Sequence, residues 1–158
     1  MTDKKRTLPD SFHRVFGETQ LTVGLLTPVE AYPDTPFPSL TDHGSLVQRA
    51  EEAGFASIWL RDVPFYDPNF GDAAQVVDPF VYAGYLAAIT RQITLGSAGI
   101  VLPLRDPISV AKQSASTDLL TAGRFILGVS TGDRAAEYPA FGIDFAERRE
   151  RFQESVAM

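Results

Sequence analysis

Cysteine is absent from this chain of 158 residues, and histidine occurs only twice, as His13 and His43. The absence of cysteine excludes disulfides, thiolate metal sites and a cysteine nucleophile. Neither histidine has the spacing to a carboxylate that is typical of a metal site, so we expect no metal. His13 falls in the first residues and His43 at the start of a predicted helix, and we expect both to be surface residues.

Long apolar runs are also missing. No stretch approaches the ~20 residues that a membrane-spanning helix needs, and no apolar signal core follows the basic start of the chain. A net charge of −6 argues against a nucleic-acid partner. We therefore expect a cytoplasmic protein that binds neither membranes nor nucleic acid.

What the chain does have is a repeating pattern of short apolar segments, which predict buried parallel strands. They start near residues 21, 56, 93 and 125, about 35 residues apart with helical patterns between them, as in βα units. This predicts an α/β fold of TIM-barrel type with about four units, half of a (β/α)8 barrel, over residues 21–158, after an N-terminal arm at 1–20. The strands are predicted at 21–27, 55–60, 93–96 and 125–129, and the helices at 42–54, 78–90, 106–123 and from 144 onward. Residues 128–132 hold only two of the glycines of a dinucleotide fingerprint, which argues against a Rossmann domain.

Two helices share one starting device, an aspartate followed by proline at 78–79 and again at 106–107. Aspartate is a preferred N-cap, and proline is favoured at the first helical position. In the second of these helices Ile108, Ala111, Ala115 and Leu119 recur at three- and four-residue spacing, which predicts the buried face. Gly123 suits the left-handed position that ends a helix.

Four parallel strands cannot close into a barrel and would leave two unpaired edges. The sequence is therefore compatible with a piece of a longer protein, with a half-barrel that pairs with a second copy, or with a sheet covered by its own helices. Long proline-rich loops at 28–39 and 61–77 are of a length that usually has a functional reason.

Small or hydroxylated residues follow two of the predicted strands, as Ser97-Ala98-Gly99 and as Ser130-Thr131-Gly132. Ligands of parallel α/β folds bind at the carboxyl ends of the strands, where such residues would let a flat ring approach the backbone. Asp62 follows another strand. The alternatives are a bulge at 97–99, a turn cap at 130–132, and an ion pair between Arg61 and Asp62.

The order of several short motifs resembles one known family. They are Gly99–Pro103 with Asp106-Pro107, Gly123–Phe125 with Leu127–Val129, Glu52–Phe55 with Ile58-Trp59 and Asp62, and Leu86–Thr90 leading into Ile93–Gly96. Together they resemble the bacterial-luciferase-like, flavin-dependent monooxygenases over roughly residues 21–156.

The resemblance implies an oxidoreductase, a monooxygenase that uses reduced FMN, or alternatively a deazaflavin, with oxygen or a small organic substrate. It implies that Ser97, Ala98 and Gly99 support the flavin ring, often through a non-proline cis peptide, and that Ser130, Thr131 and Gly132 contact the ring. Asp62 and Ser130 are the predicted catalytic residues. Luciferase itself has histidines around Arg61–Val63 and a cysteine near Ser130, so we do not expect its light-emitting aldehyde chemistry. The alternative is a non-catalytic flavin-binding or assembly module, a homodimer paired through its open strand edges.

Overall fold

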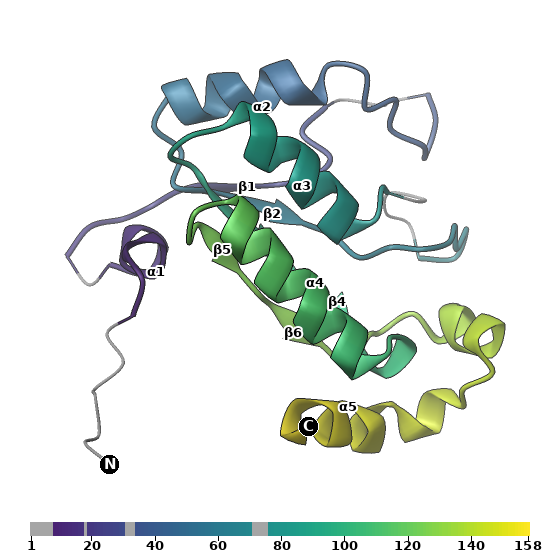
Figure 1. Cartoon of the computed structure of the whole chain (residues 1–158). Coiled ribbons are helices and arrows are strands. Elements are labelled where there is room, and N and C mark those ends of the chain that lie inside the picture. Colours follow the sequence, from purple (N-terminus) through teal and green to yellow (C-terminus); the bar gives the residue numbers. More distant parts are fainter. Residues whose placement is uncertain (1–7, 18, 31–33, 71–75) are drawn as a thin grey trace, which may run out of the picture.

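A four-stranded parallel sheet organises the protein, as seen in a computed structural model that describes residues 8–17, 19–30, 34–70 and 76–158. The strands follow the order β1-β2-β3-β5, and each neighbouring pair is parallel (Figure 1). They span β1 Gly24–Leu26, β2 Ser57–Leu60, β3 Thr94–Ser97 and β5 Phe125–Ile126. The predicted parallel α/β class is confirmed. Parts of the predicted arm and of both long loops (1–7, 18, 31–33 and 71–75) lie outside the described residues.

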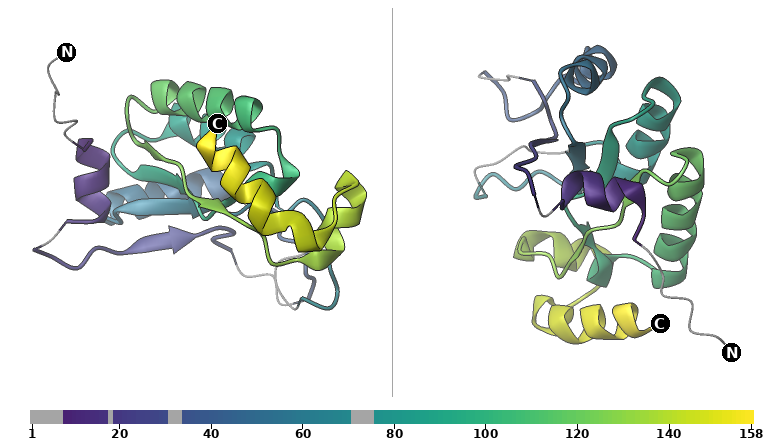
Figure 2. Two further views of the ribbon diagram at one scale, coloured as in Figure 1. Left: turned by 90° about the horizontal axis from the view of Figure 1, so that it is seen from below. Right: turned by 90° about the vertical axis from the view of Figure 1, so that its left-hand side faces the viewer.

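Three helices alternate with these strands and lie over the same face of the sheet (Figures 1 and 2). They are α2 His43–Glu52, α3 Pro79–Ile89 and α4 Pro107–Leu120. Between helices and strands lies one apolar core, whose fully buried members include Val47, Ile58, Leu86, Leu95 and Ile100. Sequential parallel strands joined by right-handed crossovers place every helix on one side, which is the arrangement found in a barrel wall.

The predicted strand at 125–129 is wrong in one respect, because it is two strands. β5 ends at Ile126, and β6, Val129–Ser130, pairs instead with β4, Ile100–Val101. Gly96 faces Ile126, and the next aligned pair is Ile100 with Val129, so residues 97–99 lie opposite residues 127–128 only. One strand therefore carries one extra residue, which is a β-bulge. The bulge bends the sheet at the carboxyl ends of β3 and β5.

The buried face of α4 also differs from the prediction. Ile108 is 69% exposed and Leu119 is 81% exposed, whereas Val110 and Thr117 are buried. The Thr117 hydroxyl donates to the carbonyl of Gln113 one turn earlier, so its polar group is satisfied inside the helix. Because a satisfied threonine can be buried at little cost, hydrophobicity alone selected the wrong face.

The predicted caps of α3 and α4 are present. The Asp78 carboxylate accepts the amides of Phe80 and Val81, and Asp106 accepts the amide of Ser109. Gly123 follows α4 with φ +80°, a conformation that L side chains rarely adopt. By contrast, Asp42 precedes α2 without a side-chain cap bond.

Short helices lie at the two ends of the described chain. Near the start, α1 Asp10–Val15 packs at the amino ends of β3 and β5, where Ser11 Oγ donates to the Gly123 carbonyl at 2.8 Å. The last segment holds the 3-10 helices η1 Leu102–Leu104, η2 Ala135–Phe141 and η3 Phe145–Glu147 and then α5 Arg148–Ala157. α5 packs beside η1. Within the described ranges, no helix has the length and apolar character required to cross a membrane.

Candidate functional site

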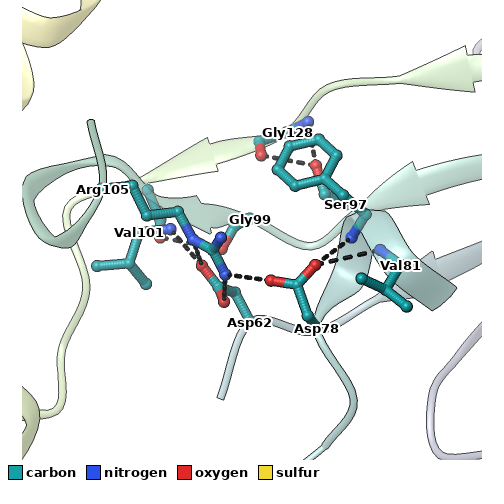
Figure 3. Close-up of polar contacts among 10 residues, drawn as sticks. Asp62, Asp78, Val81, Ser97, Gly99, Val101, Arg105 and Gly128 are labelled. Carbon is teal, nitrogen blue, oxygen red and sulfur yellow. Dashed lines mark hydrogen bonds and ion pairs between the residues drawn. The ribbon is translucent and has the colours of Figure 1, made fainter. Parts of the chain in front are cut away.

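Ser97 ties the two sides of the bulge together. Its Oγ accepts the amide of Gly128 at 2.9 Å and donates to the carbonyl of the same residue at 2.8 Å (Figure 3). The residue is 1% exposed. The Ser97 side chain, which was predicted to bind the cofactor, is therefore buried below the ends of the strands, where it holds Gly128 against β3.

Three glycines let the segments around the bulge approach one another closely. A Cβ atom at Gly128 would lie 2.1 Å from the Ser97 carbonyl oxygen, and one at Gly99 would lie 3.0 Å from the carbonyl carbon of Val129. At Gly132 a Cβ would lie 2.6 Å from a methyl carbon of Val101, and φ is +71°. A larger residue at any of these places would push the strand ends apart.

The remaining predicted cofactor-binding residues lie on the accessible edge that the bulge creates. Ala98 is exposed, and Gly99, Ser130, Thr131 and Gly132 are half-buried. The hydroxyl of Ser130 donates to the Gly99 carbonyl at 3.3 Å, so the two predicted segments are in direct contact. The structure thus brings the two segments together.

The expected non-proline cis peptide in the 97–99 segment is not found. Within the described ranges the cis peptide bond is the one between Thr27 and Pro28. The extra residue of the bulge, rather than a cis bond, makes the bend at Ala98-Gly99. The alternative that Ser97-Ala98-Gly99 form a bulge is therefore the one the structure shows.

Asp62 follows β2 and lies in a network that joins three elements (Figure 3). Its Oδ2 accepts the amide of Val101 at 3.0 Å and Nε of Arg105 at 3.0 Å, while Oδ1 accepts Nη2 of Arg105 at 2.6 Å. The Asp62 side chain is 5% exposed. The sequence left open an ion pair between Arg61 and Asp62. Asp62 does form an ion pair, but its partner is Arg105.

Arg105 continues this network to the start of α3. Its Nη2 also lies 3.0 Å from Oδ2 of Asp78, the N-cap residue of that helix. Burial by itself would lower the pKa of the Arg105 guanidinium, but its bonds to Asp62 and Asp78 outweigh this and raise it. The guanidinium therefore stays charged and joins two carboxylates at the carboxyl end of the sheet.

Glu137 is a buried acid that the sequence analysis missed. It lies on η2 and is 2% exposed, and its Oε1 has no hydrogen-bond partner and lies 3.9 Å from Nε of Arg134. Burial raises its pKa to about 7; Arg134 opposes this, and the carboxylates of Asp62, Asp133 and Asp67 add to it. No pattern in the sequence distinguished this glutamate from exposed ones, because η2 is an irregular 3-10 segment without helical periodicity.

The prediction that His43 lies on the surface is wrong. It is 2% exposed, its Nδ1 is hydrogen-bonded to the Tyr82 hydroxyl, and its Nε2 lies 3.9 Å from Oε2 of Glu30. Burial lowers the pKa of the imidazole, and Glu30 partly opposes this shift. His43 shares the inner face of α2 with Val47 and Ala50, and this four- and three-residue spacing was the signal that could have placed it.

Cavities occur at both ends of the sheet. One of about 560 Å³ lies at the amino ends of the strands, and its lining includes Val23, Glu51 and Gln92. Two of about 180 and 250 Å³ adjoin Asp62 and Arg105 at the carboxyl ends. Of the predicted site residues, Asp62 lines both of the smaller cavities, whereas the residues of the 97–99 and 130–132 segments line neither.

Comparison with known proteins identifies the family of the chain. The sequence profile of the luciferase-like monooxygenases matches residues 19–158. The chain is 30% identical over 131 residues to the 4-hydroxyprotoasukamycin monooxygenase of Streptomyces nodosus subsp. asukaensis, a match that covers 83% of this chain and 34% of that one.

Two solved structures share the fold. One is the oxygenating constituent of 3,6-diketocamphane monooxygenase from Pseudomonas putida in complex with FMN, with a TM-score of 0.69, 17% identity and coverage of 87% of this chain and 38% of that chain. The other is an F420-dependent secondary alcohol dehydrogenase in complex with an F420-acetone adduct, with a TM-score of 0.66, 25% identity and coverage of 86% and 40%. The chain thus spans between a third and two fifths of the length of these proteins. The profile match extends over nearly the whole sequence, and the chain belongs to the luciferase-like monooxygenase family.

Proposed function

We propose that this chain contributes the amino-terminal part of a flavin site in a luciferase-like oxidoreductase. The proposed cofactor is reduced FMN, with a deazaflavin as the alternative, and the proposed co-substrate is oxygen or a small organic molecule. The supporting observation is the bulged edge, where an exposed Ala98 lies beside half-buried residues of the β6 end. That edge is where parallel α/β folds bind ligands.

The residues at this edge fit a flat, polar-rimmed ring. The exposed Ala98 and the half-buried Gly99 and Gly132 carry no bulky side chain, so a ring can lie against the chain there. The Thr131 hydroxyl can donate to a ring oxygen or nitrogen atom, and the Ser130 hydroxyl, whose proton is donated to the Gly99 carbonyl, can accept a hydrogen bond from the ring. In this proposal Ala98 and Gly99 support the ring, Ser130 and Thr131 contact its edge, and Ser97 holds the two segments in register.

A bound flavin would supply the redox chemistry, and the residues of this chain would orient it and exclude water. The relatives support both cofactor types, because one structural neighbour contains FMN and the other an F420 adduct. Ser130 lies close enough to the Gly99 carbonyl to hold its hydroxyl at a fixed place beside the ring. Asp62 lines the cavities beside this edge, where a small substrate would enter.

The proposal is tested by fluorescence titration of the chain with FMN and, separately, with the deazaflavin F420, followed by reoxidation of the bound reduced flavin in air. Saturable binding that is lost in Ala98→Phe supports the proposed ring site, because a bulky side chain on this exposed residue would fill the edge. Ala115→Phe, at an exposed alanine on α4, makes the same change away from this edge and is the matched control. Binding without a change in the reoxidation rate would favour the non-catalytic module, and binding of neither cofactor would contradict a flavin site within this chain.

A further inference from the structure

We propose that Arg105 and Asp62 are positioning residues of the flavin site, which hold the bulged backbone of residues 98–101 at the place where the ring would rest. This inference rests on the proposed function and adds a residue, Arg105, that is not among the predicted site residues. It assigns Asp62 an action through the backbone in place of direct contact with substrate.

The amide of Val101 is the point of attachment. β3 ends at Ser97, the bulge follows, and the amide of Val101 then donates to Oδ2 of Asp62 at 3.0 Å. Earlier in the same segment the Ala98 amide donates to the Leu60 carbonyl at 2.7 Å, and the Ile100 amide donates to the Gly128 carbonyl at 2.8 Å. Asp62 thus adds the last of three anchors along a segment of four residues.

Arg105 is needed because a buried carboxylate is costly unless it is paired. The Asp62 side chain is only 5% exposed, and two of its three hydrogen bonds come from Arg105. The paired, fork-shaped geometry fixes the plane of the carboxylate, so that Oδ2 remains directed at the Val101 amide. Loss of Arg105 would leave a desolvated negative charge that can escape only by turning toward water and releasing the backbone.

The same guanidinium anchors this arrangement to a rigid element. Its Nη2 also contacts Asp78, whose other carboxylate oxygen caps α3. The bulge is therefore linked through Asp62 and Arg105 to the start of a helix that packs in the main core. Groups fixed in this way can hold a ligand surface within the small tolerance that a flavin site requires.

The opposite end of β3 provides a matched control. There the Glu51 carboxylate accepts the amides of Arg91, Gln92 and Ile93, and the Ile93 bond is 2.8 Å long. Glu51→Gln therefore disturbs a carboxylate that holds backbone amides just before β3, at its amino end. Both variants weaken the hold of a carboxylate on backbone amides, and they differ in their distance from the predicted ring site.

The experiment measures amide hydrogen exchange and flavin affinity in the wild type, Arg105→Met, Arg105→Lys and Glu51→Gln. We expect Arg105→Met to speed exchange at Val101 and to raise the flavin Kd by about tenfold or more. Arg105→Lys keeps the positive charge without the fork-shaped geometry of the guanidinium. Its exchange rate at Val101 and its flavin Kd should therefore lie between those of the wild type and those of Arg105→Met. Glu51→Gln should speed exchange at Ile93 and leave both the Val101 amide and the flavin Kd unchanged within about twofold.

Unchanged exchange at Val101 in Arg105→Met would overturn the positioning role, as would an equal loss of flavin affinity in Glu51→Gln. If Arg105→Met does not fold, Arg105→Lys decides between the same outcomes. Failure of the wild type to bind either flavin would instead overturn the proposed function, and the exchange data would still show whether Arg105 holds the bulge.

Discussion

Glu137 shows how strongly the surroundings of a single residue set its chemistry. Its carboxyl is buried beside Arg134, and the charges of Asp62, Asp133 and Asp67 act on it from neighbouring segments. Burial raises its pKa from 4.5 to about 7, so that it holds a proton over part of the physiological range. An acid of this kind links the stability of the fold to pH.

The direction of that link follows from proton binding. Between pH 4.5 and pH 7 the folded protein keeps a proton on Glu137 that the unfolded chain has released, so this group's stabilisation is lost as the pH rises through about 7. Glu137→Gln removes this titration. We expect the variant to gain stability relative to the wild type, on the order of 1–3 kcal/mol, between pH 5 and pH 8.

Urea denaturation at several pH values checks this expectation. Glu154→Gln, which removes an exposed glutamate on α5, controls for the loss of one negative charge. Stability curves for Glu137→Gln and the wild type that stay parallel from pH 5 to pH 8 would contradict the assignment.

At the scale of elements, the two Asp-Pro starts resemble each other in sequence but differ in their surroundings. Asp106 caps α4 through the amide of Ser109. Asp78 caps α3 through the amides of Phe80 and Val81 and also pairs with Arg105. The same dipeptide is thus a local signal in α4 and part of a tertiary network in α3.

This difference predicts that loss of Asp78 and loss of Asp106 lower the free energy of unfolding by unequal amounts. We expect Asp78→Ala to lower the free energy of unfolding by about 1–2 kcal/mol, because the cap and one partner of Arg105 disappear together. Asp106→Ala loses only a cap and should lower the stability less. Chemical denaturation of the two variants, with Asp78→Asn to retain the cap without the charge, measures the difference. Equal losses for the two alanine variants would mean that the contact with Arg105 adds nothing.

Local signals explain which elements the sequence could predict. The Asp-Pro caps, Gly123 and the apolar segments at 57–60 and 94–97 each determine structure through their nearest neighbours, and these elements were predicted. The buried face of α4 could not be, because the burial of Thr117 depends on a hydroxyl bond that hydrophobicity does not record.

The site was predictable only in part for the same reason. Both small-residue segments were predicted at strand ends, and the structure has them there in contact with each other, since strand ends and small residues are visible in sequence. The role of Arg105 was not, because it depends on Asp62 and Asp78, which lie 43 and 27 residues away in the chain. An ion pair between residues far apart in the chain produces no periodic pattern in the sequence.

At the scale of the whole molecule, β1 forms one edge of the described sheet, and exposed apolar residues lie within it and just before it. Leu21 is 94% exposed, Val23 is 55% exposed and Leu26 is 53% exposed. An apolar strand edge is a place where another chain can add a strand. A two-fold axis beside β1 would pair two copies in antiparallel fashion.

We therefore expect this chain to self-associate through the β1 edge. Val23→Lys places a charge on that edge and should weaken the association by about tenfold or more. Val156→Lys, on α5 at 59% exposure, makes the same chemical change elsewhere. Sedimentation velocity over a range of concentrations compares them with the wild type. Association that is equally sensitive to both variants, or absent from the wild type, would contradict the role of β1.

The bulge at residues 97–99 determines which residues before and after it point into each of the two hydrophobic clusters. Side chains alternate along a strand, so odd and even residues serve opposite layers. Leu95 and Ile100 nevertheless share the main core, while Val101 joins Leu104 and Tyr138 in a second cluster. Because of the extra residue, an odd-numbered residue before the bulge and an even-numbered residue after it point into the same core. Deletion of one residue there would exchange Ile100 and Val101 between the layers, so the length of this short segment is constrained by both cores as well as by any ligand it holds.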